Sequence, residues 1–592
     1  MRALFPRYLP VLDWGRRYRR GTFVNDATAA LIVTVMLIPQ SLAYALLAGL
    51  PPEVGLYASI LPLLVYAVLG TSRTLSVGPV AVVSLMSAAA VAKVATPGTS
   101  EYLAAALVLA VLSGLILVLA GVLRLGFLAN FLSHPVVSGF ITASGILIAA
   151  SQLRHLLGVP GGGHQLPGML RALAGQLGGV HGPTIAVGLT TLVFLVVARR
   201  WATPALLSVG LGKRAATTLA RAAPAAAVLL GIGAVVLLDL DGRGVRVVGA
   251  IPSGLPRFAL PSFDAALWGS LAGSALLISV VGFVESISVA RTFAARRRQR
   301  IEPDQELLGL GAANLASGLS GGYAVTGGFS RSAVNFDAGA ETPAAGALTA
   351  VGIALATLYL APWLRFLPIA VLAATIVVAV LSLVDIATLR QTWRYSRADF
   401  AAVALTIVVT LLAGVELGIA TGVGLSILLH LWNTSRPHFA IVGQVPGTEH
   451  FRNVERHDVV TSEHVLTIRV DESLYFANAS FLEDLVQGAV AERAAVTDVV
   501  LMCPAVNRID ASGLDGLEAI RRHLADGGIR LHLSEVKGPV MDRLHGTRFL
   551  HELGGHVFLT QHAAMQALDP ESSRRALASA SSPAREPGLD TV

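Results

Sequence analysis

Long apolar segments separated by short polar ones fill residues 27–432. They divide at glycine, proline and charged residues into about fourteen segments. Segments this apolar, near twenty residues long, are typical of membrane-spanning helices. The expected spans are 27–47, 54–69, 75–94, 103–123, 131–153, 184–198, 222–238, 266–290, 305–319, 330–340, 344–360, 368–384, 400–413 and 416–432.

Beyond residue 446 the pattern changes to short segments in which strand and helix periods alternate. Residues 465–470, 498–503 and 529–536 have strand patterns, and helical patterns run near 481–491 and from Gly513. This alternation predicts a small α/β domain. We therefore expect an N-terminal segment at 1–22, a membrane domain at 23–435, a linker at 436–445, an α/β domain at 446–568 and a tail at 569–592, whose Ser, Ala, Arg and Pro predict disorder.

The composition supports a membrane protein and argues against several other classes. Hydrophobic residues make up 54% of the chain and charged residues 14%, which is too apolar for a protein with a fully wet surface. The N-terminal residues lack the pattern of a removable signal peptide, so we expect the first span to insert the protein itself. The single Cys503 excludes an intrachain disulfide.

The sequence also contains few groupings that could support enzymatic chemistry. It has no GxxxxGK[ST] motif for a nucleotide and no grouped nucleophile, base and acid, so we expect neither an enzyme nor a cofactor. Four histidines near the C-terminus are spaced too irregularly for a zinc site, so no metal is expected. They are His545, His551, His556 and His562.

Basic residues gather in a few clusters along the chain. An even number of expected spans lies between any two of these clusters, so all of them fall on the same side of the membrane. That side is expected to be the cytoplasm, and both termini fall there. The formal charge of +7 is thus interpreted as a topology signal and not as a nucleic-acid surface, with anionic lipid as a further alternative. Abundant Ala, Gly, Arg and Leu suggest a GC-rich bacterium and its inner membrane. The clusters are Arg16, Arg17, Arg19 and Arg20; Arg199, Arg200, Lys213, Arg214 and Arg221; Arg291, Arg296, Arg297, Arg298 and Arg300; and Arg390, Arg394 and Arg397.

Two spans are interrupted at membrane depth. After Gly78 and Pro79 the apolar run is only about 22 Å of helix, short of the roughly 30 Å hydrocarbon core. A second break, residues 320–343, places glycines, hydroxyls and Arg331 before another short helical piece. Irregular backbone cannot face lipid, so both breaks must line a protein-enclosed cavity. Each is the third segment of a seven-span half, as in a transporter site built from inverted repeats.

The two breaks suggest a site for an anion. A helix N-terminus carries about half a positive charge and unpaired N–H groups, so half-helices that start face to face at Gly78-Pro79 and at Ser330 would attract a negative ligand. Arg331 adds a full charge, which is expensive at midplane unless it holds an anion or a partner. An ion pair with Glu285 is an equally weighted alternative, and both can hold at different stages of a cycle. For the glycines, the alternative is close helix packing.

Four segments of the sequence, "IPQSLAYALLAGLPPEVGLYAS", "GTSRTLSVGPVAVVSL", "GGFSRSAVNFDAGAET" and "RIDASGLDGLEAI", resemble the SulP family of sulfate permeases and related anion transporters. The similarity spans roughly residues 23–568. It implies a polytopic α-helical fold of fourteen segments in two inverted repeats of seven, divided into core and gate domains, with a cytoplasmic α/β STAS domain. Family members commonly form homodimers. The resemblance places the anion site on Gln40, Tyr44, Gly78, Pro79, Val80, Phe329, Ser330 and Arg331.

The resemblance also matches Glu285 to an acidic position linked to cation coupling. A glutamate within a span is itself a functional candidate, although it can also be a structural partner of Arg331 or of a serine. Gln40 stands where some proton-coupled relatives carry an acid, so proton uptake would rest on Glu285. Val289 stands where sodium-coupled relatives carry a hydroxyl, which disfavours sodium.

These residues lead to a functional hypothesis. We expect a secondary active transporter that takes up sulfate or a similar oxyanion together with protons, because a buried carboxyl group can carry a proton. The alternatives are a bicarbonate, chloride or dicarboxylate exchanger or symporter, an uncoupled anion channel, and an anion sensor that signals through the STAS domain.

One serine of the C-terminal domain is a regulatory candidate. Ser512 lies in "DASGL", residues 510–514, which resembles the loop that carries a phosphorylatable serine in anti-sigma-factor antagonists. The favoured alternative is a helix N-cap, with Ser512 or Asp510 accepting backbone N–H bonds.

Overall fold

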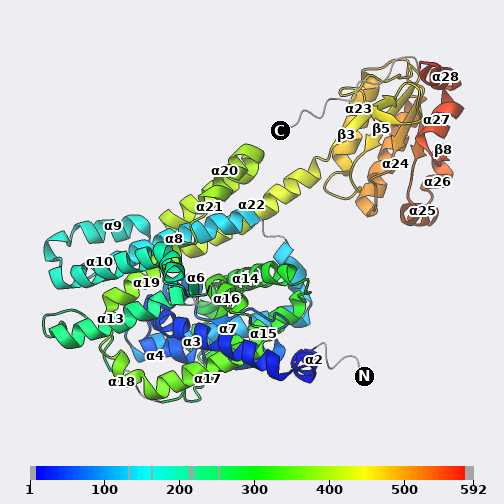
Figure 1. The fold of residues 1–592 in the computed structure, drawn as a ribbon. Coiled ribbons are helices and arrows are strands. Elements are labelled where there is room, and N and C mark those ends of the chain that lie inside the picture. Colours follow the sequence, from blue (N-terminus) through cyan, green and yellow to red (C-terminus); the bar gives the residue numbers. More distant parts are fainter. Residues whose placement is uncertain are drawn as a thin grey trace. The chain divides into compact units, whose positions relative to one another are not determined.

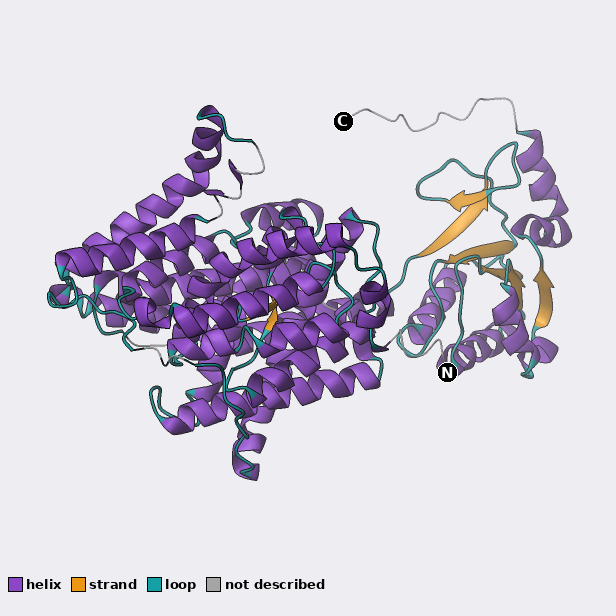
Figure 2. Cartoon of the chain, turned by 60° about the horizontal axis from the view of Figure 1, so that its bottom comes forward, coloured by secondary structure: helices purple, strands orange, loops and turns teal. Residues whose placement is uncertain are grey.

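The computed structural model describes residues 8–130, 134–161, 165–212, 216–217, 219–220, 222–250, 252 and 254–579. Its chain divides into two compact units, Met1–Ile427 and Leu428–Val592. The first unit is almost entirely helical and the second contains a six-stranded sheet (Figures 1 and 2).

Helices coincide with every expected span, so the prediction of a polytopic helical membrane domain is confirmed. Among the described residues, eight segments are long and apolar enough to cross a membrane. The helices up to Ser435 are α2 (Val11–Arg16), α3 (Arg20–Leu47), α4 (Pro52–Tyr57), α5 (Leu61–Leu69), α6 (Ala81–Val91), α7 (Ser100–Val122), α8 (His134–Leu157), α9 (Leu166–Ala174), α10 (Gly182–Val197), α11 (Thr203–Ser208), α13 (Ala223–Leu238), α14 (Ala265–Arg296), α15 (Pro303–Leu319), α16 (Phe329–Asp337), α17 (Ala344–Tyr359), α18 (Ala361–Leu364), α19 (Ile369–Leu381), α20 (Ile386–Tyr395), α21 (Arg397–Ala413) and α22 (Val415–Ser435).

The two interrupted spans are the short helices α6 and α16, each preceded by a two-residue strand. Strands β1 (Val77–Gly78) and β2 (Thr326–Gly327) pair antiparallel inside the helical unit (Figure 2). This pairing satisfies backbone groups that lipid could not. It also corrects the predicted helix starts: α6 begins at Ala81 and not at Gly78-Pro79, and α16 begins at Phe329, one residue before Ser330.

Helix α15 anchors the backbone that leads into both strands. The carboxylate of Glu306, which is fully buried, accepts hydrogen bonds from the backbone N–H groups of Thr71 at 2.7 Å and Ser72 at 3.0 Å. Two turns later, the amide of Asn314 donates to the Val325 carbonyl at 2.8 Å and accepts from the Val325 N–H at 2.9 Å. A buried polar group left unpaired costs about 1–3 kcal/mol, so these bonds fix where β1 and β2 lie.

The second unit is an α/β domain around one mixed sheet. The strand order is β4-β3-β5-β6-β7-β8; β3 pairs antiparallel with β4 and β5, and β5 to β8 are parallel. The strands are β3 (Phe439–Gln444), β4 (Phe451–Asn453), β5 (Val465–Val470), β6 (Asp498–Met502), β7 (Arg530–Ser534) and β8 (Gly554–Phe558), and the helices are α23 (Ala479–Ala491), α24 (Ala511–Asp526), α25 (Gly538–His545), α26 (Phe549–Glu552), α27 (Gln561–Leu568) and α28 (Pro570–Ala578).

Two boundary predictions at this unit are wrong. The expected linker, 436–445, contains β3, because its backbone pairs on both sides and Ala440 and Val442 are buried. The first part of the expected disordered tail is helix α28, which Asp569 caps by accepting from the Ser572 N–H at 3.0 Å, and in which Ala576 is fully buried. Residues 580–592 of that tail lie outside the described residues.

Asp510, and not Ser512, caps helix α24. Its carboxylate accepts from the Gly513 N–H at 2.8 Å and from the Phe476 N–H at 3.1 Å, whereas Ser512 is exposed on the first turn. We expect Asp510→Ala to destabilise the C-terminal unit by about 1 kcal/mol and Ser512→Ala to change it by less than about 0.5 kcal/mol. Thermal unfolding of the two variants against wild type measures both values. Equal losses in the two variants would contradict this assignment of the cap.

Candidate functional site

The starts of α6 and α16 meet at the strand pair, near the middle of the helical unit and among α3, α7 and α14 (Figure 1). The residue before each helix, Val80 for α6 and Gly328 for α16, has extended backbone and no side-chain capping bond. The first N–H groups of both helices therefore keep their capacity to bind a ligand or water. Pro79 lies between β1 and Val80, where its missing N–H removes no strand hydrogen bond.

Arg331, on the first turn of α16, is the buried cation of this region. It is only 2% exposed. Its Nη2 donates to the Thr326 carbonyl at 3.5 Å, and its Nη1 has no hydrogen-bond partner among the described residues. A buried guanidinium nitrogen without a partner is rare in proteins, and it is costly at membrane depth. The arginine therefore has a free donor where the two helices start.

Two glycines, one from each interrupted span, make room for this guanidinium group. A Cβ atom at Gly78 would lie 2.7 Å from Nη1 of Arg331, and a Cβ at Gly328 would lie 3.2 Å from its Nε and Nη2. Any side chain at Gly78 would therefore displace the arginine. The close approach explains why glycine occurs at both breaks.

Glu285 on α14 is an electrostatic neighbour of Arg331, together with Tyr44 and Tyr323. Among the described residues Glu285 and Arg331 form no ion pair, because the guanidinium group donates only to the Thr326 carbonyl. Tyr323 is fully buried and its hydroxyl shares a 2.8 Å hydrogen bond with that of Ser84 on α6. The region thus combines one cation, one carboxyl group and two phenols.

A cavity of about 180 Å³ brings three of the expected residues together. Gln40 and Tyr44 line it from α3, and Ser330 lines it from α16. We call it the Tyr44 cavity. Its remaining wall comes from α10, α13 and α19, with Leu195, Pro224, Thr375, Ile376, Val378 and Ala379 among the lining residues.

The other expected residues lie around the helix starts and not on this lining. Phe329 turns away from the cavity: it is 48% exposed, and its ring lies 5.7 Å from that of Phe293 on α14. The Val80 side chain lies instead near Gly328, 3.2 Å from the position of a Cβ there. The exposed Phe329 side chain is therefore poorly placed to contact an anion in the Tyr44 cavity.

Some residues near the site were not expected from the sequence. Arg199, from the loop cluster interpreted as a topology signal, lines the Tyr44 cavity and donates to the Val378 carbonyl at 3.2 Å. Ser286, next to Glu285, shares a 2.7 Å hydrogen bond with Thr326 and accepts from the Gly327 N–H at 2.8 Å. Its position beside the intramembrane glutamate was the available signal.

Comparison with known sequences gives matches to two family models. Residues 23–406 match the sulfate permease family and residues 456–564 match the STAS domain. The chain is 35% identical over 582 residues to a probable sulfate transporter, 4.2, of Arabidopsis thaliana, covering 95% of this chain and 83% of that one. It is 34% identical over 558 residues to a probable sulfate transporter of Mycobacterium tuberculosis, with coverages of 93% and 96%.

Solved structures share the fold. The murine Solute Carrier 26 family member A9 anion transporter, in the inward-facing state, superposes with a TM-score of 0.87 at 23% identity, over 96% of this chain and 95% of that one. The transmembrane domain of the cyanobacterial bicarbonate transporter BicA gives a TM-score of 0.58 at 22% identity, over 69% and 98%. With its membrane domain, its STAS domain and these relatives, the chain belongs to the sulfate permease family, a family of transporters and not of enzymes.

Proposed function

We propose that this protein is a secondary active transporter of small anions that takes up sulfate or a similar oxyanion together with protons. The observation that carries the proposal is the free Nη1 of Arg331 between two helix N-termini that have no side-chain cap. The names of the Arabidopsis and Mycobacterium relatives support sulfate as the first candidate substrate. Gln40, Tyr44, Gly78, Pro79, Val80, Ser330 and Arg331 form the proposed binding region.

An oxyanion would complete the partners that this region lacks. Guanidinium nitrogens and helix-start N–H groups both donate hydrogen bonds to anionic oxygens, and several oxygens let one anion accept from both helices. Gly78 and Gly328 permit the approach because neither carries a Cβ. The surrounding low dielectric strengthens the attraction, and water would compete poorly there.

The position of the Tyr44 cavity supports alternating access. Its walls belong to α3 and α16 on one side and to α10, α13 and α19 on the other. In the proposed mechanism the first group moves as a core against the second as a gate, so that the site opens to each side of the membrane in turn. Motion of this kind would close the cavity at one face and open a path at the other.

Glu285 supplies a physical basis for proton coupling. When its carboxyl group is ionised, it offsets the charge of Arg331, with which it interacts electrostatically, and weakens anion binding. A proton on Glu285 restores the full positive potential, so proton and anion favour each other's binding by the same free energy. Sodium is disfavoured as the coupling ion because Val289 carries no hydroxyl.

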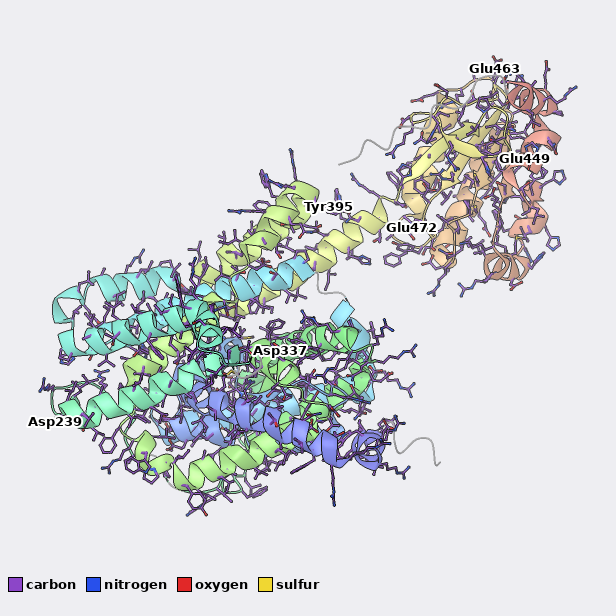
Figure 3. All side chains as sticks on the ribbon, viewed as in Figure 1. Asp239, Asp337, Tyr395, Glu449, Glu463 and Glu472 are labelled. Atoms are coloured by element: carbon purple, nitrogen blue, oxygen red, sulfur yellow. The ribbon has the colours of Figure 1, made fainter. Side chains whose placement is uncertain are left out.

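The side chains on the helix surfaces support a membrane setting with polar helix ends. Leu229 and Leu237 of α13 are 70% and 83% exposed, as expected for residues that face lipid, whereas Asp239 ends that helix (Figure 3). We propose that the protein lies in a bacterial inner membrane with both termini in the cytoplasm, and the basic loops on one side of the membrane support this orientation. A homodimer is proposed on the family resemblance, and exposed Ser512 is the proposed regulatory position.

Uptake by proteoliposomes tests the function. Purified protein is reconstituted, and entry of radiolabelled sulfate, bicarbonate and fumarate is measured with and without an inward proton gradient. We expect sulfate to accumulate above its own gradient only when the proton gradient is present. Accumulation of another anion alone would make that anion, and not sulfate, the proposed substrate. Equilibration that is indifferent to pH would indicate an exchanger or channel. No flux of any anion would overturn the proposal that the protein is a transporter.

A further inference from the structure

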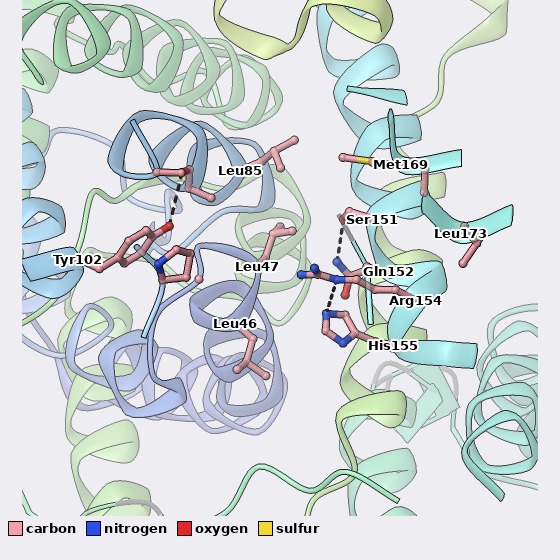
Figure 4. A pocket seen from close by; sticks show the side chains of 16 residues that line it. Leu46, Leu47, Leu85, Tyr102, Ser151, Gln152, Arg154, His155, Met169 and Leu173 are labelled. Atoms are coloured by element: carbon pink, nitrogen blue, oxygen red, sulfur yellow. Dashed lines mark hydrogen bonds between the residues drawn. The ribbon is translucent and has the colours of Figure 1, made fainter. Parts of the chain in front are cut away.

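A second cavity, of about 330 Å³, lies on the other side of the Tyr44 position along α3. Figure 4 shows it between the helical bundle that carries Leu46, Leu47 and Leu85 and the neighbouring helix α8. Met169 and Leu173 of α9 also line this cavity. We call it the Arg154 cavity.

The described residues provide no counterion for the positive charge of this cavity. Among the described lining residues, the basic ones are Arg154 and His155 of α8, and none is acidic. Figure 4 shows Arg154 pointing from α8 toward Leu47. Arg246 is close enough to act electrostatically on both, and no carboxylate among the described residues does so. Arg154 and Arg246 both carry a full positive charge, so they repel each other, and a bound anion would relieve this repulsion.

The hydrogen bonds at this cavity leave Arg154 with free donors. Its Nε donates to Nε2 of His155 at 3.1 Å, and neither of its terminal nitrogens has a hydrogen bond to another described residue. The other polar groups of the lining are already used: Gln152 donates to Ser151 at 2.9 Å, and the Tyr102 hydroxyl donates to the Ala48 carbonyl at 2.8 Å. The guanidinium group of Arg154 is therefore the lining group that can donate hydrogen bonds to an oxyanion.

The cavity lies close to the proposed binding region along α3 and α6. Leu85 lies four residues after the first residue of α6, about 6 Å along the helix, and Leu46 lies two residues after Tyr44. The cavity lies at the C-terminal ends of α3, α6 and α8. In the proposed topology these ends are outside, opposite the basic loops.

We propose that the Arg154 cavity is an external binding site for small oxyanions, where Arg154 holds the substrate before it moves to the helix starts. This inference rests on the proposed function. It goes beyond the proposed function because it assigns a separate site, with its own arginine, to the outer part of the transport path.

Sided kinetics of Arg154→Gln test this site. Sulfate uptake is measured in cells that lack their own sulfate transport, and efflux is measured from preloaded cells. We expect the KM for external sulfate to rise about tenfold or more, since a hydrogen bond to a charged group is lost, while the KM for efflux stays within about twofold. Arg171→Gln, on exposed α9 and outside the lining, is the matched control and should behave as wild type.

A second pair of variants leaves Arg154 in place. Leu173→Glu introduces a negative charge into the lining and should raise the external KM, whereas Leu173→Gln should not. An external KM unchanged by both Arg154→Gln and Leu173→Glu overturns the inference, and so does equal impairment of uptake and efflux, which would indicate a structural role. Absence of sulfate flux in the wild type would instead overturn the proposed function.

Discussion

Replacing Arg331 with glutamine is expected to lower sulfate uptake about a hundredfold. The substitution removes the one full positive charge that the described structure places between the starts of α6 and α16, together with the free Nη1. Hydrogen bonds to charged groups contribute about 1.5–3 kcal/mol each, and loss of the charge adds to this in a low-dielectric site. Initial rates across a range of external sulfate concentrations, normalised to the amount of protein, measure the loss.

Two further variants separate charge from geometry. Arg331→Lys keeps the charge but loses the planar fork, so we expect intermediate activity. Arg365→Gln removes an arginine that instead lies over the Phe366 ring at 4.3 Å, and it should transport at the wild-type rate. If Arg331→Gln retains more than half of the wild-type rate, the arginine does not bind the transported anion.

Replacing Glu285 with glutamine is expected to abolish the response to a proton gradient while anion exchange continues. Glutamine has nearly the same shape as a protonated glutamate but cannot release a proton. One pH unit corresponds to about 1.36 kcal/mol, so each coupled proton raises the attainable accumulation about tenfold. In proteoliposomes with an inward gradient of one pH unit and the membrane potential clamped at zero, wild-type protein should accumulate sulfate about tenfold for each coupled proton. Glu285→Gln should accumulate none.

Exchange measurements distinguish coupling from a structural role. Swapping of internal and external sulfate at equal pH needs no net proton movement, so Glu285→Gln should exchange at a rate comparable to wild type. Glu101→Gln, at the exposed start of α7, is the matched control and should keep its proton-driven accumulation. Continued accumulation in Glu285→Gln would assign coupling elsewhere, and loss of exchange as well would leave Glu285 as a structural partner of Arg331.

Much of the membrane fold could be predicted because each span is a continuous apolar segment whose length must match the bilayer. The strand pair could not be predicted in this way. Strands of two residues carry no periodic pattern, and the pairing of Val77 with Gly327 joins positions far apart in the chain. The shifted start of α6 follows from the same cause, because Gly78 is engaged in the strand before the helix begins.

The site was predictable where a charged or helix-breaking residue stood out against an apolar background, as Arg331 and Glu285 do. Arg199 was overlooked because a basic residue at a span end has a sufficient explanation in topology. The errors at the C-terminal unit have a different origin. Strand β3 and helix α28 gain their stability from contacts with distant segments, such as the bond from the Gly447 N–H to the Ala576 carbonyl at 2.8 Å, which local composition does not reveal.

The pairing of β1 with β2 ties the two helix starts into one mechanical part. Neither N-terminus can move away from the other without breaking a buried backbone ladder that Glu306 and Asn314 hold from outside. The groups that would surround an anion are therefore carried as a fixed set while the rest of the protein moves around them. Such a carrier would present the same chemical selectivity to both sides of the membrane, and only the route to it would differ.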